Sequence, residues 1–290
     1  MPILSGRARL AGLLGWPVAH SRSPRLHNFW LERYGIDGAY VPLAAPPAAL
    51  PTAIRGLAAA GFAGCNVTLP HKEAAYALCD TASDQARRIA AVNTLVFRDG
   101  KIHGSSTDGE GFLANLRDHG VDPAKPALVL GAGGAARDIA AALIDAGASV
   151  SIANRTPARL DRLLRLLPAL TPLAWEARSA ALATHALLVN TTAAGMSGQP
   201  PLDIDLARAP ASLVVADIVY APLVTPLLAA AESRGLATVP GLGMLLHQAV
   251  PGFAAWFGTT PRVDRALFDF IAADLASDLA PGGHPASPDA

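Results

Sequence analysis

Short apolar runs alternate with longer segments of helical periodicity along the first third of the chain. The runs predict strands, and apolar positions that recur every three or four residues predict helices. The expected elements are strands over residues 10–15, 40–43 and 65–69, with helices from about 23, over 50–60 and from 70 toward 78. Ser23 is expected to cap the first helix, with Pro24 at its first helical position. Strands that alternate with helices indicate a mainly parallel sheet covered by helices.

A hairpin and a second α/β pattern follow. Residues 92–97 and 102–103 flank Asp99-Gly100, a pair that suits a primed turn. A helix is expected over 111–119. The later expected elements are strands over 127–130, 150–153, 186–190 and 213–218, and helices over 157–167 and 226–234. From Gly241 only helices are expected, over 244–256 with a kink at Pro251 and over 264–279, and the Pro/Gly/Ser-rich residues 280–290 are expected to be a disordered tail.

A glycine-rich loop lies between the strand expected at 127–130 and the next helix. This is the context in which a G-x-G-x-x-G/A motif binds a dinucleotide. Gly131 allows the tight turn, Gly133 lets the backbone approach a pyrophosphate, and Ala136 lets helix and strand pack closely. The N–H groups at the start of the helix would face the phosphates. Because Gly and Ala abound in this chain, a turn formed only for packing is the alternative.

Two arginines stand where an NAD-binding protein usually has an acid. That acid lies about twenty residues beyond the loop and bonds the ribose 2′-OH. Here the chain has Asn154-Arg155-Thr156 followed by Arg159. A guanidinium can bind a 2′-phosphate that an acid would repel, so the pattern favours NADP. In the alternative interpretation Thr156 only caps a helix and both arginines are solvated surface charges.

Composition excludes several classes of function. The net charge is zero, 51% of residues are hydrophobic and 16% are charged, and no basic block suggests a nucleic-acid or membrane-surface partner. Cys65 and Cys79 form no C-x-x-C pair and the histidines show no H-E-x-x-H spacing, so no metal site is expected. The first residues lack signal-peptide features and no apolar run is long enough to span a membrane. A cytoplasmic protein is therefore expected.

Polar residues at strand and helix ends are the candidates for substrate binding. Ser21 and Ser23 lie near a helix N-terminus and could hold a small carboxylate, although Ser23 could be only the helix cap. Asn66 and Thr68 would share one face of the strand expected over 65–69.

Lys72 and Asp108 are the candidates for proton transfer. Lys72 begins a helix, where the macrodipole disfavours a cation, so it is either a solvated charge or one kept for function. Asp108 could be only an N-cap, and Asn93-Thr94 only a polar pair that begins a hairpin strand.

Nine motifs occur in order between about residues 10 and 260. They are Gly15-x-Pro17-x-x-His20-Ser21-x-Ser23-Pro24, Asn66-Val67-Thr68-x-Pro70-x-Lys72, Ala91-Val92-Asn93-Thr94, Ser106-Thr107-Asp108-Gly109-x-Gly111-Phe112, the glycine loop, Asn154-Arg155-Thr156, Asn190-Thr191-Thr192-x-x-Gly195-Met196, Asp217-x-x-Tyr220 and Gly241-Leu242-Gly243-Met244-Leu245-x-x-Gln248. Together they resemble the shikimate dehydrogenase family. The chain departs from the family pattern at Ser106, often Asn, and at Ala193, often Pro.

The resemblance implies an α/β enzyme that uses NADPH to reduce 3-dehydroshikimate to shikimate, a step toward the aromatic amino acids. It implies a substrate-binding domain with a mainly parallel sheet over residues 1–107 and a Rossmann-type NADP-binding domain over 108–239. The helices over 240–279 would return to the substrate domain. A monomer and a homodimer both stay open.

The resemblance also implies residue roles. The implied substrate ligands are Ser21, Ser23 and Tyr220 for the carboxylate and Thr68, Asn93 and Gln248 for the ring hydroxyls. The implied catalytic pair is Lys72 and Asp108. The implied cofactor site consists of Gly131, Ala132, Gly133, Gly134, Ala135, Asn154, Arg155, Thr156, Arg159, Ile218 and Gly241, with Asp84 near it.

Three rival functions are weaker. Quinate-using relatives tend to have Thr as the second hydroxyl of the carboxylate motif and an acid in the cofactor strand, and Ser23 and Arg155 argue against both. The aminoshikimate dehydrogenases are a further related alternative. A non-catalytic NADP-binding regulator would be expected to lack Lys72 or Asp108, and this chain has both.

Overall fold

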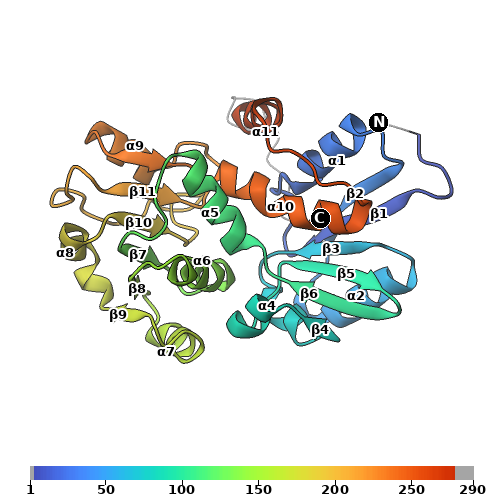
Figure 1. The fold of residues 1–290 in the computed structure, drawn as a ribbon, viewed down its shortest axis with the longest axis horizontal. Coiled ribbons are helices and arrows are strands. Elements are labelled where there is room, and N and C mark those ends of the chain that lie inside the picture. The colour runs from blue at the N-terminus through green and yellow to red at the C-terminus, as the bar shows by residue number, and fades with distance from the viewer. Residues whose placement is uncertain (1–2, 278–290) are drawn as a thin grey trace. The chain divides into compact units, whose positions relative to one another are not determined.

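The computed structural model describes residues 3–277, which form two compact units (Figure 1). The first unit contains the chain up to Thr107 and again from Gln248, and the second contains the residues from Asp108 to His247. The chain therefore leaves the first unit once and returns to it once. The return lies within helix α10 (Leu242–Phe257), a little beyond the boundary expected at 240. The tail expected over 280–290 lies outside the described residues.

The first unit is built on a six-stranded mixed sheet of order β2-β1-β3-β5-β6-β4. Its strands are β1 (Arg9–Gly15), β2 (Gly38–Ala44), β3 (Gly64–Val67), β4 (Thr81–Ala82), β5 (Thr94–Arg98) and β6 (Lys101–Ser105). Strand β1 is parallel to β2 and β3, and β4 is parallel to β6, whereas β5 is antiparallel to β3 and β6. Between β5 and β6, Asp99 and Gly100 both have positive φ, so the expected primed-turn hairpin is confirmed.

The helices of the first unit are α1 (Ser23–Arg33), α2 (Leu50–Ala59), α3 (Lys72–Tyr76), α4 (Asp84–Ile89) and α11 (Arg265–Ser277), together with the C-terminal part of α10. A buried cluster of rings ties α1 and α10 to the sheet. It consists of His27, Trp30, Tyr40, Phe253 and Trp256. The ring of His27 stacks on Tyr40, with 4.0 Å between centroids. The cluster joins α1 and β2, from early in the chain, to α10.

Trp256 also bonds to the sheet directly. Its Nε1 donates a 2.9 Å hydrogen bond to the backbone oxygen of Leu95. A Cβ at Gly64 would lie 2.3 Å from that same nitrogen, so only glycine lets the indole approach β3 this closely. Helix α11 packs against α1, and its buried residues Leu267, Ile271 and Leu275 recur at helical spacing.

The second unit is a fully parallel six-stranded sheet of order β12-β11-β10-β7-β8-β9. Its strands are β7 (Ala127–Leu130), β8 (Val150–Ala153), β9 (Thr171–Leu173), β10 (Leu187–Asn190), β11 (Val214–Asp217) and β12 (Ala237–Val239). Its helices include α5 (Asp108–Asp118), α6 (Gly134–Asp145), α7 (Pro157–Leu166), α8 (Arg178–Ala181) and α9 (Pro226–Ser233). Read from β9, the order is the 3-2-1-4-5-6 of a dinucleotide-binding Rossmann fold.

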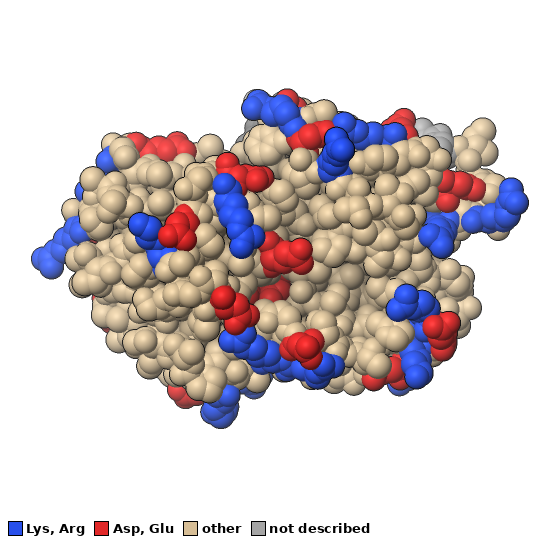
Figure 2. Space-filling model, viewed as in Figure 1, with Lys and Arg blue, Asp and Glu red and all other residues tan. Residues whose placement is uncertain are grey.

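Charged side chains of both signs are interspersed over the face shown in Figure 2. Within residues 3–277, no helix has the length and apolar character needed to cross a membrane.

Candidate active site

The serine pair lies at the start of α1. Ser23 is the first residue of the helix, so the expectation that it caps α1 is wrong; Arg22 occupies the cap position. Instead, Ser21 Oγ accepts a 3.2 Å hydrogen bond from the backbone N–H of Ser23. Ser21 Oγ also lies 3.3 Å from Ser23 Oγ. The two hydroxyls are therefore paired at a helix N-terminus, where a carboxylate is favoured.

The loop after β1, which leads to the serine pair, contacts the loop after β3. The N–H of Trp16 donates to the carbonyl of Leu69 at 3.0 Å. A Cβ at Gly15 would lie 2.4 Å from Thr68 Cγ2, so glycine is required for this approach. Strand β3 ends at Val67, which leaves Thr68 half-buried in the loop beyond it. The strand therefore ends two residues before the expected residue 69, and the shared face of Asn66 and Thr68 stays a prediction.

Lys72 is the first residue of α3 and is half-buried rather than fully solvated. Its backbone carbonyl accepts a 3.0 Å hydrogen bond from the N–H of Val92. This bond fixes the start of α3 next to the segment that carries Asn93. The catalytic lysine candidate and one substrate-ligand candidate are thus held by neighbouring backbone in one unit.

Asn93 is buried in a hydrogen-bond network that fixes its side chain. Its Oδ1 accepts from the N–H of Thr107 at 3.0 Å. Its Nδ2 donates to Thr107 Oγ1 at 3.0 Å and to Gln248 Oε1 at 3.3 Å. Since the backbone N–H of Thr107 can only donate, the amide orientation of Asn93 is determined. Asn93 and Gln248, both expected to bond ring hydroxyls, are in direct contact.

A second series of buried hydrogen bonds supports Asn93 from the side of the core. Tyr40 donates to Asn66 Oδ1 at 2.6 Å, and Asn66 Nδ2 donates to the carbonyl of Asn93 and to Thr94 Oγ1, each at 3.1 Å. No side-chain role was expected for Tyr40 or Thr107, and Asn66 was expected only to share a strand face with Thr68. The signal that could have found them is polar side chains in apolar strands, which must find buried partners.

The glycine loop has the geometry that a pyrophosphate requires. Gly131 has φ +122°, and a Cβ there would lie 2.4 Å from Thr191 Oγ1. A Cβ at Gly133 would meet nothing within 4 Å, so the backbone is open to a ligand on that side. Gly133 occupies the cap position of α6, and no described side chain caps the helix there. The exposed N–H groups of a twelve-residue helix then remain for phosphate oxygens. The residues present fit the dinucleotide.

The expected 2′-phosphate site lies at the end of β8. Arg155, Thr156 and Arg159 are exposed, and half-buried Asn154 donates from Nδ2 to the carbonyl of Thr156 at 2.9 Å. Thr156 is at the cap position of α7, as expected, but its side chain makes no capping bond with a described residue. Asn154 and Arg155 line a cavity of about 330 Å³ together with Trp175. Two guanidinium groups beside a helix N-terminus suit a phosphate.

The remaining cofactor candidates of the second unit lie beyond β11. A Cβ at Gly241 would lie 2.5 Å from the carbonyl of Ile218, so this glycine allows two loops to touch. The N–H of Ile218 donates to the carbonyl of Asn190 at 3.1 Å. Tyr220 follows and is half-buried.

The two acidic candidates, Asp108 and Asp84, differ in burial. Asp108 is buried, as the first residue of α5. Asp84 begins α4 in the first unit, where its exposed carboxylate pairs with Arg87, and its role near the cofactor stays a prediction.

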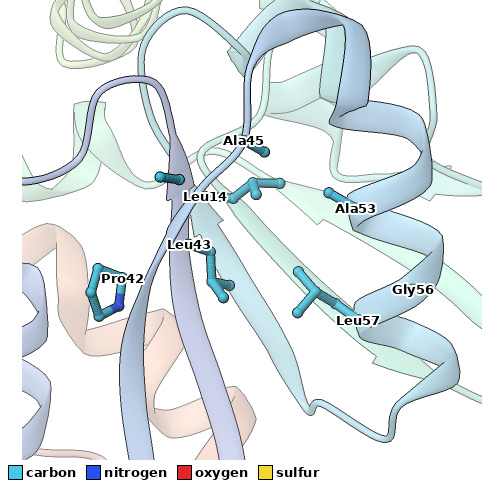
Figure 3. Close-up of a pocket in the computed structure, with 8 residues that line it drawn as sticks. Leu14, Pro42, Leu43, Ala45, Ala53, Gly56 and Leu57 are labelled. Carbon is cyan, nitrogen blue, oxygen red and sulfur yellow. The ribbon is translucent and has the colours of Figure 1, made fainter. Parts of the chain in front are cut away.

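A cavity of about 470 Å³ lies between α2 and the edge strand β2 (Figure 3). Its lining is apolar, with Leu14, Leu43 and Leu57 directed toward it, and it includes none of the candidate site residues. It is separate from the groups described above.

Comparison with known proteins agrees with this arrangement. Residues 13–95, all in the first unit, match the model of the shikimate dehydrogenase substrate binding domain. The chain is 66% identical over 274 residues to a shikimate dehydrogenase (NADP(+)) of Acidiphilium cryptum, covering 94% of this chain and 99% of that one. It is 56% identical over 275 residues to its counterpart in Rhodospirillum rubrum, covering 91% and 97%.

A solved structure has the same fold. Shikimate 5-dehydrogenase of Thermus thermophilus, in complex with NADP(H) and shikimate, superposes with a TM-score of 0.83 and 38% identity. The match covers 92% of this chain and 99% of that one. With two such units and relatives matched over nearly their whole length, the chain belongs to the shikimate dehydrogenase family.

Proposed function

We propose that this chain is an NADP-dependent shikimate dehydrogenase, which catalyses the reversible reduction of 3-dehydroshikimate to shikimate. In the oxidative direction, shikimate and NADP⁺ give 3-dehydroshikimate, NADPH and a proton. The observation that carries the proposal is the contact of Asn93 with Gln248 in the same unit as the Ser21–Ser23 pair. This unit presents hydroxyls for a carboxylate and two amides for neighbouring hydroxyl groups, the polar pattern of shikimate.

The residues divide the work as follows. Ser21 and Ser23, with Tyr220, hold the carboxylate, and Thr68, Asn93 and Gln248 bond the ring hydroxyls. The bound cofactor supplies or accepts the hydride at the ring carbon. The second unit holds that cofactor by the glycine loop, by Asn154 to Thr156 with Arg159, and by Ile218 and Gly241.

Lys72 is the proposed proton-transfer residue. When hydride reaches the ketone carbon, negative charge develops on oxygen, and a positive proton donor there stabilises the transition state. Lys72 Nζ can provide both the charge and the proton. Asp108 is proposed to orient the ammonium group, and the two residues act as a pair.

One crossed assay tests the proposal against its rivals. Purified protein is mixed with shikimate or quinate and with NADP⁺ or NAD⁺, and reduced cofactor is followed by its absorbance. Turnover with shikimate and NADP⁺ at least about ten-fold more efficient than any other pair supports it, a difference of about 1.4 kcal/mol in transition-state binding. Preference for quinate or NAD⁺ points to the related quinate enzyme, and NADP⁺ binding without turnover points to a regulator.

A further inference from the structure

We infer that Asp217 is a positioning residue that holds the nicotinamide-binding half of the second unit in shape; this inference rests on the function proposed above. Asp217 ends β11 and is 1% exposed. Its Oδ1 accepts from Asn190 Nδ2 and from the N–H of Val219, each at 3.0 Å. Its Oδ2 accepts from Thr225 Oγ1 at 2.7 Å. One carboxylate therefore joins β10, the segment after β11 and the start of α9.

Asn190 extends these bonds into the loop after β10. It is fully buried, and its Oδ1 accepts from the N–H of Thr192 at 3.0 Å and from Thr192 Oγ1 at 2.8 Å. Its Nδ2 also donates to the carbonyl of Ala194 at 3.2 Å. Because the N–H of Thr192 can only donate, Oδ1 must face that loop and Nδ2 must face Asp217. The loop after β10 and the segment after β11 are thus held by one amide and one carboxylate.

Topology assigns this network to one half of the cofactor. In a 3-2-1-4-5-6 sheet, each βαβ half binds one mononucleotide, and the dinucleotide crosses where the order reverses. The loop after β7 and the end of β8 carry the pyrophosphate and 2′-phosphate candidates, so the adenosine half lies there. Strands β10 and β11 form the other half. Ile218 follows Asp217 directly, and its N–H donates to the carbonyl of Asn190 at 3.1 Å.

A purely stabilising role does not explain a carboxylate at this position. Burial raises the pKa of Asp217, although the three hydrogen bonds oppose the shift. The buried charge therefore costs folding free energy, and an apolar side chain of similar size would pack without that cost. What an apolar side chain could not do is fix three segments in one arrangement by accepting from each.

Binding of two ligands tests the inference. The affinity for NADP⁺ and for 2′,5′-ADP, which has only the adenosine half, is measured by calorimetry for the wild type, Asp217→Ala and Asp217→Asn. We expect Asp217→Ala to lower the affinity for NADP⁺ about ten-fold or more, because the site for the nicotinamide half loses its support. The affinity for 2′,5′-ADP should stay within about two-fold of the wild-type value. Asp217→Asn keeps one acceptor oxygen, so it should lie between wild type and Asp217→Ala.

Val215→Ala is the matched control, because Val215 is a fully buried apolar residue of the same strand. It should lower the melting temperature and leave both affinities within about two-fold. If Asp217→Ala lowers the affinity for both ligands equally, or leaves the affinity for NADP⁺ unchanged, the inference is overturned. If Asp217→Ala does not fold, the affinities of Asp217→Asn decide. A loss of NADP⁺ affinity of about three-fold or more, with 2′,5′-ADP affinity unchanged, supports the inference, and a smaller loss overturns it. A wild type that binds no NADP⁺ would instead refute the proposed function.

Discussion

The hydroxyl of Thr107 donates a 2.8 Å hydrogen bond to the backbone carbonyl of Gln248. These are the last residue before the chain leaves the first unit and the first residue after it returns. The side chain of Asn93 bonds to both. Two proposed substrate ligands are therefore fixed relative to each other by a threonine that precedes the proposed catalytic acid.

Replacing Thr107 by Val should weaken substrate binding selectively. Valine has nearly the same shape but leaves the carbonyl of Gln248 and the amide of Asn93 without this partner, at about 1–3 kcal/mol. We expect KM for shikimate to rise about 5- to 50-fold while the Kd for NADP⁺ is unchanged. Thr107→Ser keeps the hydroxyl and should restore most of the affinity; a serine variant as poor as the valine variant would contradict this role.

Replacing Lys72 by Ala should reduce kcat with little change in KM for shikimate. Loss of positioned proton transfer typically costs about 10²- to 10⁴-fold in rate. Lys101→Ala, at an exposed residue that begins strand β6 of the same unit, is the control and should keep wild-type turnover. Near-normal turnover of Lys72→Ala would refute its assignment. Asp108→Asn should give a smaller fall in kcat, because the proposed role of Asp108 is orientation.

Replacing Arg155 by Ala should reduce the preference for NADP⁺ over NAD⁺. A guanidinium–phosphate pair is charge-assisted, so its loss should raise KM for NADP⁺ about 10- to 100-fold and leave KM for NAD⁺ nearly unchanged. Arg165→Ala, an exposed arginine near the end of helix α7, which follows Arg155, is the matched control. A wild type that already prefers NAD⁺ ten-fold or more would refute the NADP assignment itself.

Acid should unfold the protein partly through His27. Within the described residues neither ring nitrogen of His27 has a hydrogen-bond partner, and burial lowers its pKa from 6.5 to about 3, against a smaller opposing effect of Asn66. A histidine whose folded-state pKa is lowered contributes stability that is present above pH 6.5 and lost as the pH falls toward 3. The loss should reach about 2 kcal/mol at pH 5 and about 4 kcal/mol at pH 3.

Urea unfolding of wild type and His27→Phe at pH 7.5 and pH 5 measures this contribution. The difference at pH 7.5 reports the change in packing, and the further change at pH 5 reports the titration of His27. The variant should lose about 2 kcal/mol less than wild type between the two pH values. Equal losses would show that protonation of His27 does not contribute.

The sequence predicted central elements better than edges. Residues 127–130 and 150–153 are β7 and β8 as expected, because strands of a parallel sheet are buried on both faces and their sequences are continuous apolar runs. The edge strands β9 and β12 and the two-residue strand β4 were not predicted. Short edge strands need few apolar residues, so their hydrophobic pattern cannot be distinguished from that of a loop.

The ligand candidates were predicted from motifs, but their supports were not. Ser23 is not the cap of α1, because the helix begins one residue earlier than expected, and Ser21 instead accepts from the N–H of Ser23. The bonds from Tyr40 to Asn66 and from Asp217 to Asn190 and Thr225 join residues from different strands and loops. Such pairs depend on which strands become neighbours, and local pattern does not specify that.

The cluster around Trp256 sets an order of assembly. All twelve strands of the described part of the chain, residues 3–277, precede residue 240, and the second unit is one unbroken stretch of chain that ends at His247. During synthesis the second unit is complete before Phe253 and Trp256 emerge from the ribosome, although its residues follow those of the first sheet in the sequence. The strands of the first sheet are synthesised first, but the packing of the first unit is completed last. Until α10 and α11 are synthesised, no aromatic ring of α10 packs over His27 and Tyr40, and the carbonyl of Leu95 lacks its bond from Trp256. A nascent chain cut before α10 would hold both sheets, with an uncovered aromatic face that chaperones and proteases can recognise.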